Sequence, residues 1–237
     1  MAPQVKPSIV FCHGIWADGS CFSKVIPPLQ AQGYEVMAAQ YGLDSNVDDV
    51  AATIRTLNRV HSPALLVGHS YGGSVITAAG TDDRVAGLVY ICALGPDETE
   101  TSQGQQDKYP KTPVFSQIDV ADGRVWLKPS GIGCFCGDLP EEEQQLVYAT
   151  HYAPAADLFL HNRPGVAWRT KPSWCIVGNN DQTVHPDLER ASAKRMVPRP
   201  TTSTAATSPC CPTPTSSSTS SAPPQEESEP ARLPRAR

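Results

Sequence analysis

The stretch "LLVGHSYGGSV", residues 65 to 75, is an apolar run that ends in a glycine-rich turn with Ser70 at its centre. Residues 68–72 match the pattern G-x-S-x-G, with a predicted strand before them and a predicted helix after them. A turn this sharp strains the serine backbone, and side chains at the glycine positions would collide. The pattern predicts that Ser70 is a nucleophile presented at the carboxyl end of a sheet. A structural turn that merely joins strand to helix is the alternative.

Backbone amides close to this turn predict a site for an oxyanion. The amide N–H of Tyr71 lies at the N-terminus of the predicted helix, where a developing negative charge is stabilised. The segment "HGIWADGS", residues 13 to 20, follows the first predicted strand. There the amide of Ile15, or alternatively that of Trp16, can supply a second donor. We interpret His13 as a structural hydrogen-bonding residue and not as a base.

The wider pattern of the chain predicts an α/β fold. Short apolar, β-branched runs alternate with amphipathic segments of helix length, which is typical of a mostly parallel sheet with crossover helices on both faces. The runs are continuously apolar, which indicates burial on both sides. Strands are predicted at residues 8–14, 34–41, 63–68, 85–94 and 171–181, and core helices at residues 22–33, 45–60, 71–80 and 185–196.

The same pattern divides the chain into four segments. Residues 1–95 and 171–196 are predicted to form one core. Residues 96–170 mix glycine, proline and aromatic residues with one amphipathic helix at 139–152, and we interpret them as a cap inserted over the sheet. Residues 197–237 are dominated by proline, serine and threonine. They are predicted to be disordered, because such a segment cannot bury enough apolar surface to offset its ordering entropy.

Composition narrows the functional classes. The net charge of -5 and the absence of a basic run before the very end argue against nucleic-acid binding, so a small-molecule partner is expected. No stretch is long and apolar enough to span a membrane, and no targeting segment is found, so a cytoplasmic location is predicted. Cys134 and Cys136 form a C-x-C pair without a second ligand pair nearby, so no metal site is predicted. The oligomeric state stays open.

Four segments of this sequence resemble the α/β-hydrolase family, and within it the small esterases related to plant methylesterases and hydroxynitrile lyases. They are "FCHGIWADGSCFSKVIPPLQAQGYEV", "LLVGHSYGG", "LVYICALGPDE" and "IVGNNDQTVHPDL", and the resemblance covers about residues 7–196. It implies hydrolysis of carboxylic esters without a cofactor. Ser70 would be the nucleophile, Asp181 the triad acid, and the amides of Ile15 and Tyr71 the oxyanion hole.

The resemblance also carries expectations about the substrate. The cap is expected to cover an apolar pocket for a small, fairly apolar ester, while lactones, aryl esters and methyl esters all stay open. Aromatic candidates to line the pocket are Trp16, Phe22, Tyr71, Trp126 and Phe135. The cyanohydrin-cleaving relatives have a threonine where His13 stands, so lyase activity is not predicted.

A triad histidine is missing from its expected place. In this family the histidine follows the acid, on the loop after the last strand. No histidine occurs after His185, which lies only four residues beyond Asp181 and is predicted to have a local structural role. Among the other histidines, His69 adjoins the nucleophile and His61 precedes a strand. Two more lie in the predicted cap, His151 and His161. The sequence after Met196 also shows no pattern for the last strand and helix of the core. We therefore expect impaired catalysis, and a non-catalytic ligand-binding protein is the alternative.

One change in the gene, or in its sequencing, would explain both losses. Read from one base earlier, the codons for residues 206–214 can encode His-Val-Pro-Met-Leu-Ser-Asn-Pro, which resembles the histidine loop of the family. The codons that follow can encode a last helix. Codon degeneracy makes this alternative frame compatible with the sequence without requiring it. We hypothesise a frameshift near Met196.

Overall fold

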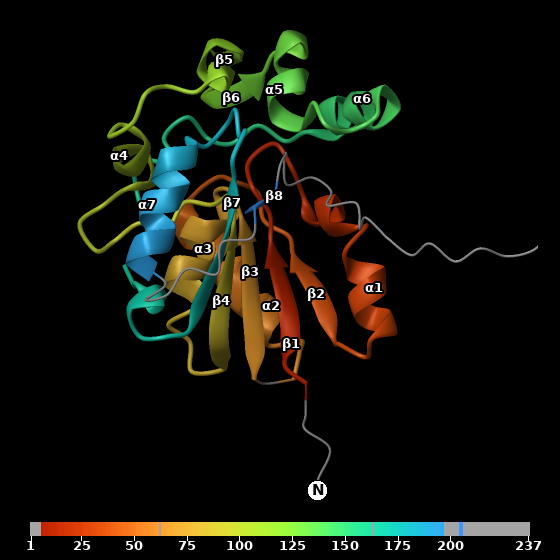
Figure 1. Cartoon of the computed structure of the whole chain (residues 1–237), viewed down its shortest axis with the longest axis vertical. Coiled ribbons are helices and arrows are strands. Elements are labelled where there is room, and N and C mark those ends of the chain that lie inside the picture. Colours follow the sequence, from red (N-terminus) through yellow and green to blue (C-terminus); the bar gives the residue numbers. More distant parts are fainter. Residues whose placement is uncertain (1–5, 62, 163, 197–203, 206–237) are drawn as a thin grey trace, which may run out of the picture.

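A six-stranded parallel sheet forms the centre of the computed structural model, with strand order β2-β1-β3-β4-β7-β8 (Figure 1). The structure describes residues 6–61, 63–162, 164–196 and 204–205, the last two for their backbone only. The strands are β1 Ser8–Cys12, β2 Val36–Ala39, β3 Ala64–His69, β4 Val85–Ile91, β7 Ser173–Gly178 and β8 Thr204–Ala205. The predicted α/β fold with a mostly parallel sheet is confirmed.

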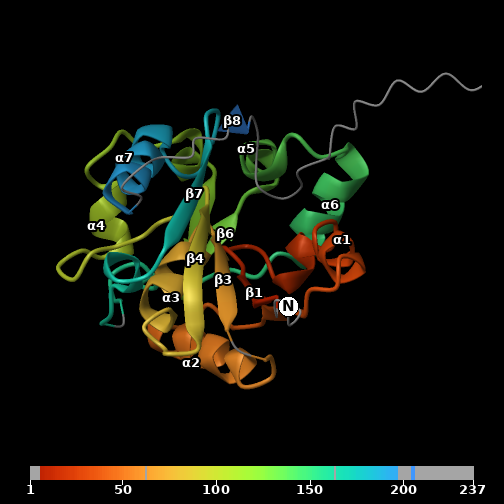
Figure 2. The same cartoon turned by 60° about the horizontal axis from the view of Figure 1, so that its bottom comes forward.

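Side-chain alternation along the strands builds an apolar layer on each face of the sheet. In β1, Val10 and Cys12 belong to the larger buried cluster, whereas Ile9 and Phe11 belong to a cluster on the opposite face. Both faces are apolar because helices pack on both, as the continuously apolar runs predicted. Figure 2 shows α2, α3 and α7 on one side of the sheet and α1 on the other.

The core helices begin and end near their predicted bounds. They are α1 Ile26–Ala31, α2 Asn46–Leu57, α3 Gly72–Ala79 and α7 Pro186–Met196. Ser45 caps α2 by accepting a hydrogen bond from the Asp48 amide at 3.1 Å. Helix α1 is shorter than predicted, because residues 19–22 form a separate 3-10 turn, η1 Gly19–Phe22.

Residues between β4 and β7 lie over the carboxyl ends of the parallel strands (Figure 1). They form α4 Ser102–Gln106, an antiparallel hairpin of β5 Ile118–Ala121 and β6 Arg124–Leu127, α5 Ile132–Cys136 and α6 Glu141–Thr150. Short 3-10 turns lie at Pro113–Ser116, Pro129–Gly131 and Ala167–Arg169. The sequence predicts an amphipathic helix here, yet none of the residues of α6 is buried. The boundaries assigned to the cap stay a prediction.

A short strand lies inside the segment that was predicted to be disordered. Strand β8 pairs with β7 in parallel, Thr204 with Val177 and Ala205 with Gly178. Two residues of a tail whose disorder stays a prediction therefore pair with the sheet. The physical reason is that an open sheet edge offers unpaired backbone groups, which can pair with a segment whatever its side chains are. Residues 197–203 and 206–237, where the last helix was expected to be missing, lie outside the described residues.

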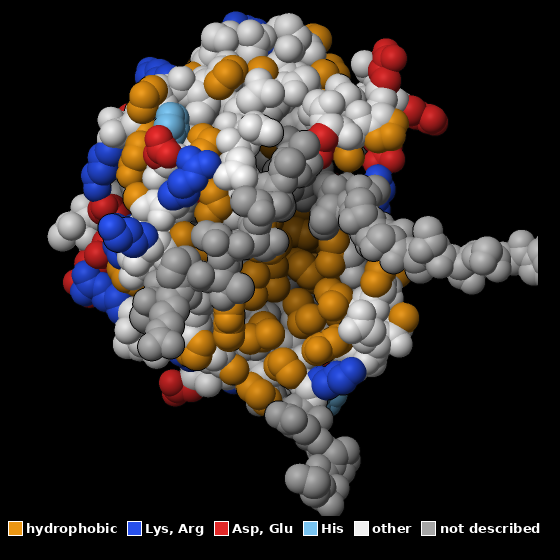
Figure 3. Space-filling model, viewed as in Figure 1, with side chains coloured by type: hydrophobic (Ala, Val, Ile, Leu, Met, Phe, Trp, Pro, Cys, Tyr) orange, Lys and Arg blue, Asp and Glu red, His pale blue; other side chains and the backbone are white. Residues whose placement is uncertain are grey.

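One face of the sheet carries an apolar row that is exposed at one end. The register places Phe11, Val67, Val89 and Trp174 side by side across β1, β3, β4 and β7. Helix α1 covers the β1 end of the row, but 45% of Trp174 is exposed at the other end. Figure 3 shows apolar side chains gathered over this face. Among the described residues, no helix covers the β7 end of the row.

A helix that crosses a bilayer needs about 20 consecutive, predominantly apolar residues. None of the described helices combines the length and the apolar character needed to cross a membrane. The cytoplasmic location stays a prediction.

Candidate active site

Ser70 lies in the turn between β3 and α3 with a φ of +53°, in the left-handed region that non-glycine residues rarely adopt. Hydrogen bonds hold this backbone in place. The Ser70 amide donates to the Ile91 carbonyl at 3.1 Å, and the Leu94 amide donates to the Ser70 carbonyl at 3.1 Å. The end of β4 therefore fixes the strained turn, at a local cost of about 1–3 kcal/mol.

Close backbone approaches explain the glycines around Ser70. A Cβ atom on Gly72 would lie 2.7 Å from the His13 carbonyl oxygen, and one on Gly68 would lie 2.5 Å from the Gly72 carbonyl oxygen. A Cβ atom on Gly14 would lie 2.9 Å from the Ser70 Cβ. The segment after β1 and the turn after β3 are thus packed against each other, as the sequence pattern required.

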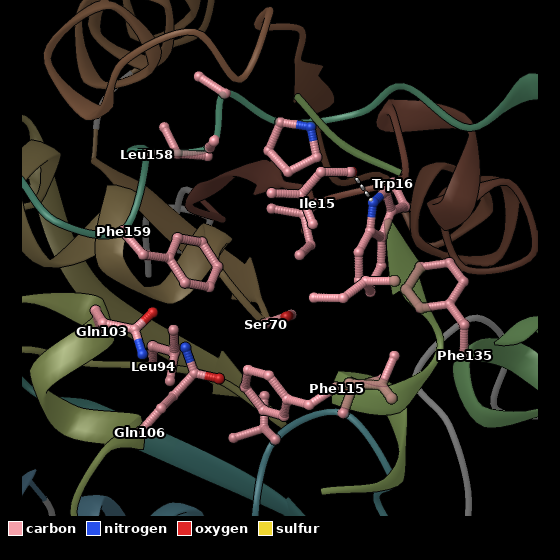
Figure 4. A pocket seen from close by; sticks show the side chains of 18 residues that line it. Ile15, Trp16, Ser70, Leu94, Gln103, Gln106, Phe115, Phe135, Leu158 and Phe159 are labelled. Carbon is pink, nitrogen blue, oxygen red and sulfur yellow. Dashed lines mark hydrogen bonds between the residues drawn. The ribbon is translucent and has the colours of Figure 1, made fainter. Parts of the chain in front are cut away.

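Ser70 opens onto an apolar cavity between the sheet and the residues above it (Figure 4). Most of the lining is aliphatic or aromatic, and Gln103 and Gln106 contribute polar groups on one side. The labelled apolar side chains around the cavity are Ile15, Trp16, Leu94, Phe115, Phe135, Leu158 and Phe159. The Trp16 indole N–H donates to the Val125 carbonyl at 2.8 Å, which ties the loop after β1 to strand β6. A cavity of this kind suits an apolar ligand with few polar atoms.

Two of the predicted pocket residues line this cavity. Trp16 and Phe135 meet edge to face, with ring centroids 5.6 Å apart. Trp126 does not line it. Side chains alternate along β6, so Val125 faces the cavity while Trp126 points away and is 40% exposed.

Phe22 and the side chain of Tyr71 also lie outside the cavity lining. Phe22 stacks on Phe11 at 4.5 Å between ring centroids, in the apolar layer that α1 covers. Tyr71 is fully buried, and its hydroxyl donates to Asp49 Oδ2 at 2.8 Å. The physical reason is that an apolar aromatic residue near a motif does not reveal which side of the sheet its ring occupies.

Asp49 is a buried acid behind the nucleophile turn that sequence reasoning missed. Its side chain accepts hydrogen bonds from the Tyr71 hydroxyl and, at 3.2 Å, from the Leu43 amide. Burial raises the pKa of Asp49 to about 6. The helical spacing of the buried residues Asn46, Asp49 and Thr53 is the signal that could have found it. This contact joins α2 to the residue that follows Ser70.

The backbone amides predicted for an oxyanion hole lie on the two segments that pack together at Ser70. Neither Ile15 nor Tyr71 donates its amide N–H to any described residue. Trp16, the alternative donor, has a φ of +56°, so the loop after β1 is strained beside Ser70 as well. Their assignment as an oxyanion hole stays a prediction.

Asp181 follows β7 on a loop that borders the same cavity, because Thr183 and Val184 line it. Asp181 Oδ1 accepts hydrogen bonds from the Thr183 amide and hydroxyl at 2.7 and 2.6 Å, and from the Val184 amide at 3.0 Å. Its other oxygen, Oδ2, is buried without a hydrogen-bond partner. Burial raises the pKa of this carboxyl. The structure therefore brings Ser70 and the Asp181 loop to one cavity and leaves one acid oxygen unpaired.

A second buried acid lies beside Asp181. Glu189 on α7 is only 3% exposed, and its Oε2 accepts a hydrogen bond from the Gly178 amide at 2.8 Å. The Cys92 sulfur and one carboxylate oxygen each of Asp181 and Glu189 lie within 4.8 Å of one another. Sequence reasoning missed Glu189, because α7 reads as an ordinary charged helix and nothing local marks one of its acids as buried.

None of the six histidines, all of which are described, hydrogen-bonds Ser70 Oγ or Asp181 Oδ2. His185 begins the turn into α7, where its Nδ1 accepts from the Asp187 amide at 3.1 Å. His13 stacks on Tyr41 at 4.0 Å between centroids, and burial lowers its pKa. Burial also lowers the pKa of His69 to about 3. The contacts of His13 and His185 are structural ones.

A model of the alpha/beta hydrolase family matches residues 9–206, and the chain belongs to that family. It is 34% identical over 99 residues to a pyrethroid hydrolase of Sphingobium wenxiniae. The aligned residues cover 36% of this chain and 35% of that relative. The chain is 30% identical over 112 residues to a carbendazim hydrolyzing esterase of Nocardioides sp., which covers 40% and 45% respectively. The chain thus spans less than half the length of these curated relatives.

Two solved structures share the fold over most of both chains. A crystal structure of a pyrethroid hydrolase has a TM-score of 0.70 at 22% identity and covers 87% of this chain and 91% of that one. A crystal structure of polyneuridine aldehyde esterase has a TM-score of 0.71 at 15% identity and covers 84% and 89%. At these identities the likeness shows a common fold.

Proposed function

We propose that this chain is a serine hydrolase of small, fairly apolar carboxylic esters, with its catalysis impaired by the lack of a base. The observation that carries the proposal is Ser70, held with a φ of +53° at a strand-to-helix turn that opens onto an apolar cavity. Membership of the alpha/beta hydrolase family and relatives named as a hydrolase and an esterase support it.

In the proposed reaction, Ser70 Oγ attacks the ester carbonyl, the bond to the alcohol oxygen breaks and the alcohol leaves with the proton that Ser70 lost. Water then attacks the acyl-serine, which releases the acid and restores Ser70. The amides of Ile15 and Tyr71 receive the negative charge of the tetrahedral intermediate, and each such donor is worth about 3 kcal/mol when preorganised. The apolar part of the ester lies among Trp16, Phe135 and other cavity residues. No metal or cofactor enters this scheme.

Ser70 needs a base to accept its proton, and no base lies beside Ser70 among the described residues. Asp181 Oδ2 is buried and unpaired, on the acid that would orient a histidine in an intact triad. In the serine protease subtilisin, loss of the triad histidine alone lowers turnover about a millionfold. We propose a deficit of that order here.

A non-catalytic binding protein is the second candidate. It is favoured by one observation, that the cavity is formed although Ser70 Oγ has no hydrogen-bonded base among the described residues. Saturable binding of an apolar ester, with no chemical change at Ser70, would support it.

Covalent labelling separates the two candidates. We expect a fluorophosphonate to label Ser70, faster when imidazole is added as an external base, with mass spectrometry locating the adduct. Ser70→Ala should abolish the adduct, while Ser130→Ala, which removes an exposed hydroxyl elsewhere, should leave it unchanged. Absence of any adduct on Ser70, together with saturable ester binding, would overturn the hydrolase proposal.

A further inference from the structure

Two buried carboxyl groups meet where β7 ends and α7 packs against it. Asp181 Oδ2 and Glu189 Oε1 are both buried, and neither has a hydrogen-bond partner if both groups are ionised. Their other oxygens are satisfied by backbone and hydroxyl donors, including the Gly178 amide for Glu189. One carboxylate oxygen of each acid lies in one small cluster, with the Cys92 sulfur as its third member.

No positive charge is available to this cluster from the described residues around it. Both arginines of α7 pair elsewhere, Arg190 with Asp187 and Arg195 with Glu100. The other titratable groups that face Glu189 from the sheet are Tyr90 on β4, Cys92 directly after β4, and Cys175 on β7. Burial raises the pKa of each of these three groups, so all are neutral near pH 7.

Two adjacent buried carboxylates cannot both stay ionised without a counter-charge. Desolvation penalises each charge, and mutual repulsion adds to that penalty, so such a pair retains a proton. A proton on Glu189 Oε1 gives this atom a donor, and Asp181 Oδ2 is an acceptor without a partner. One hydrogen bond then satisfies both unpaired atoms.

We propose that Asp181 and Glu189 share one proton, which Glu189 carries on Oε1 and donates to Asp181 Oδ2, so that Glu189 positions the acid of the site. The bond also ties α7 to the loop that borders the cavity. Burial and the Asp181 charge raise the pKa of Glu189 to about 9, which agrees with this proton placement. The pairing does not depend on whether the chain hydrolyses esters.

The pH dependence of unfolding tests the proposal. The pKa of Glu189 rises from 4.5 to about 9 on folding, so its stabilising contribution is complete below about 4.5 and is lost as pH rises through about 9. Between these values the folded chain holds one proton more than the unfolded chain. Glu189→Gln keeps the donor and the acceptor but cannot titrate. With rising pH, the unfolding constant of the native protein should increase relative to that of Glu189→Gln, about tenfold per pH unit.

Denaturant titrations at a series of pH values measure this ratio, and Glu142→Gln is the matched control. Glu142 is an exposed acid on α6, so Glu142→Gln makes the same chemical change outside the buried pair and should leave the pH profile of the native protein unchanged. If the ratio of the unfolding constant of the native protein to that of Glu189→Gln does not vary with pH, the proposal is overturned.

Infrared spectroscopy provides a second readout that a purely structural role would not change. The carbonyl stretch of a protonated carboxylic acid should be present at pH 7 in the native protein and absent from Glu189→Gln. Asp181→Asn removes the neighbouring charge, so the acid band should disappear at a lower pH than in the native protein. An Asp181→Asn band that titrates as in the native protein would contradict a shared proton. Stoichiometric zinc in the purified protein, lost on Glu189→Gln, would show that a cation holds the pair instead.

Discussion

Ser70 keeps a left-handed backbone because the residues around it leave no room for another arrangement. Its amide and carbonyl are both held by the chain that leaves β4, and the glycines beside it admit the neighbouring segments. The strain is therefore maintained by packing over a long sequence separation and not by the pentapeptide alone.

Gly72→Ala should lower the free energy of unfolding by about 1–3 kcal/mol, because its Cβ would press against the carbonyl oxygens of Cys12 and His13. Urea unfolding measures the change. The control is Gly133→Ala in α5, where a Cβ meets nothing within 4 Å and the better helix propensity of alanine should raise stability by up to about 1 kcal/mol. Equal effects of the two substitutions would show that crowding at the turn is not what requires the glycine.

At the scale of elements, the sheet is unevenly covered. Trp174 on β7 lies over Gly87 of β4, where an added Cβ would be 2.9 Å from the indole ring. The apolar row from Phe11 to Trp174 therefore continues beyond the part that α1 covers. Exposed apolar surface of this kind favours association.

Trp174→Lys should reduce self-association of the protein, because it places a charge at the exposed end of the apolar row. Light scattering coupled to size exclusion, at matched concentrations, measures the effect. Val120→Lys is the control, since Val120 is 67% exposed on β5 and lies away from this row. Native protein that stays monomeric at high concentration, or association that Val120→Lys reduces equally, would show that this face does not drive contact between chains.

The core elements could be predicted from sequence because each is a local pattern. An apolar, β-branched run such as β3, followed by a glycine-rich turn, suffices to place a strand, a turn and a helix. The hairpin of β5 and β6 was not predicted, since its strands have only four residues each and mixed burial. The choice between Val125 and Trp126 as the cavity residue depends on how this hairpin lies over the sheet, which no local pattern reveals.

At the scale of the whole molecule, the motif residues of the site were predictable and its supporting contacts were not. Ser70, Ile15 and the Asp181 loop lie at one cavity as the motifs indicated. The hydrogen bond between Tyr71 and Asp49 joins elements far apart in the sequence, and the proximity of Glu189 to Asp181 depends on how α7 packs on β7, so no local motif marks either pair. Buried acids in amphipathic helices are the feature to look for in such a chain.

The reading frame after Met196 is also a question about the whole molecule. Strand β8 occupies the edge of β7 with only two residues, Thr204 and Ala205. Independent sequencing of the gene across the codons for residues 194–214 tests the frameshift hypothesis. A base gained or lost there would restore a histidine and a last helix, whereas an unchanged frame would reject the hypothesis.

Ester turnover by the purified chain, with and without imidazole, tests the central claim most directly. An aryl ester of a short acid is the probe, and Ser70→Ala is assayed beside the native protein so that hydrolysis by imidazole itself is subtracted. We expect only trace turnover without imidazole and a Ser70-dependent increase when it is added, because Ser70 has its turn and cavity but no base beside it among the described residues. Identical rates for the two proteins under both conditions would contradict the claim that Ser70 is the nucleophile of an ester hydrolase.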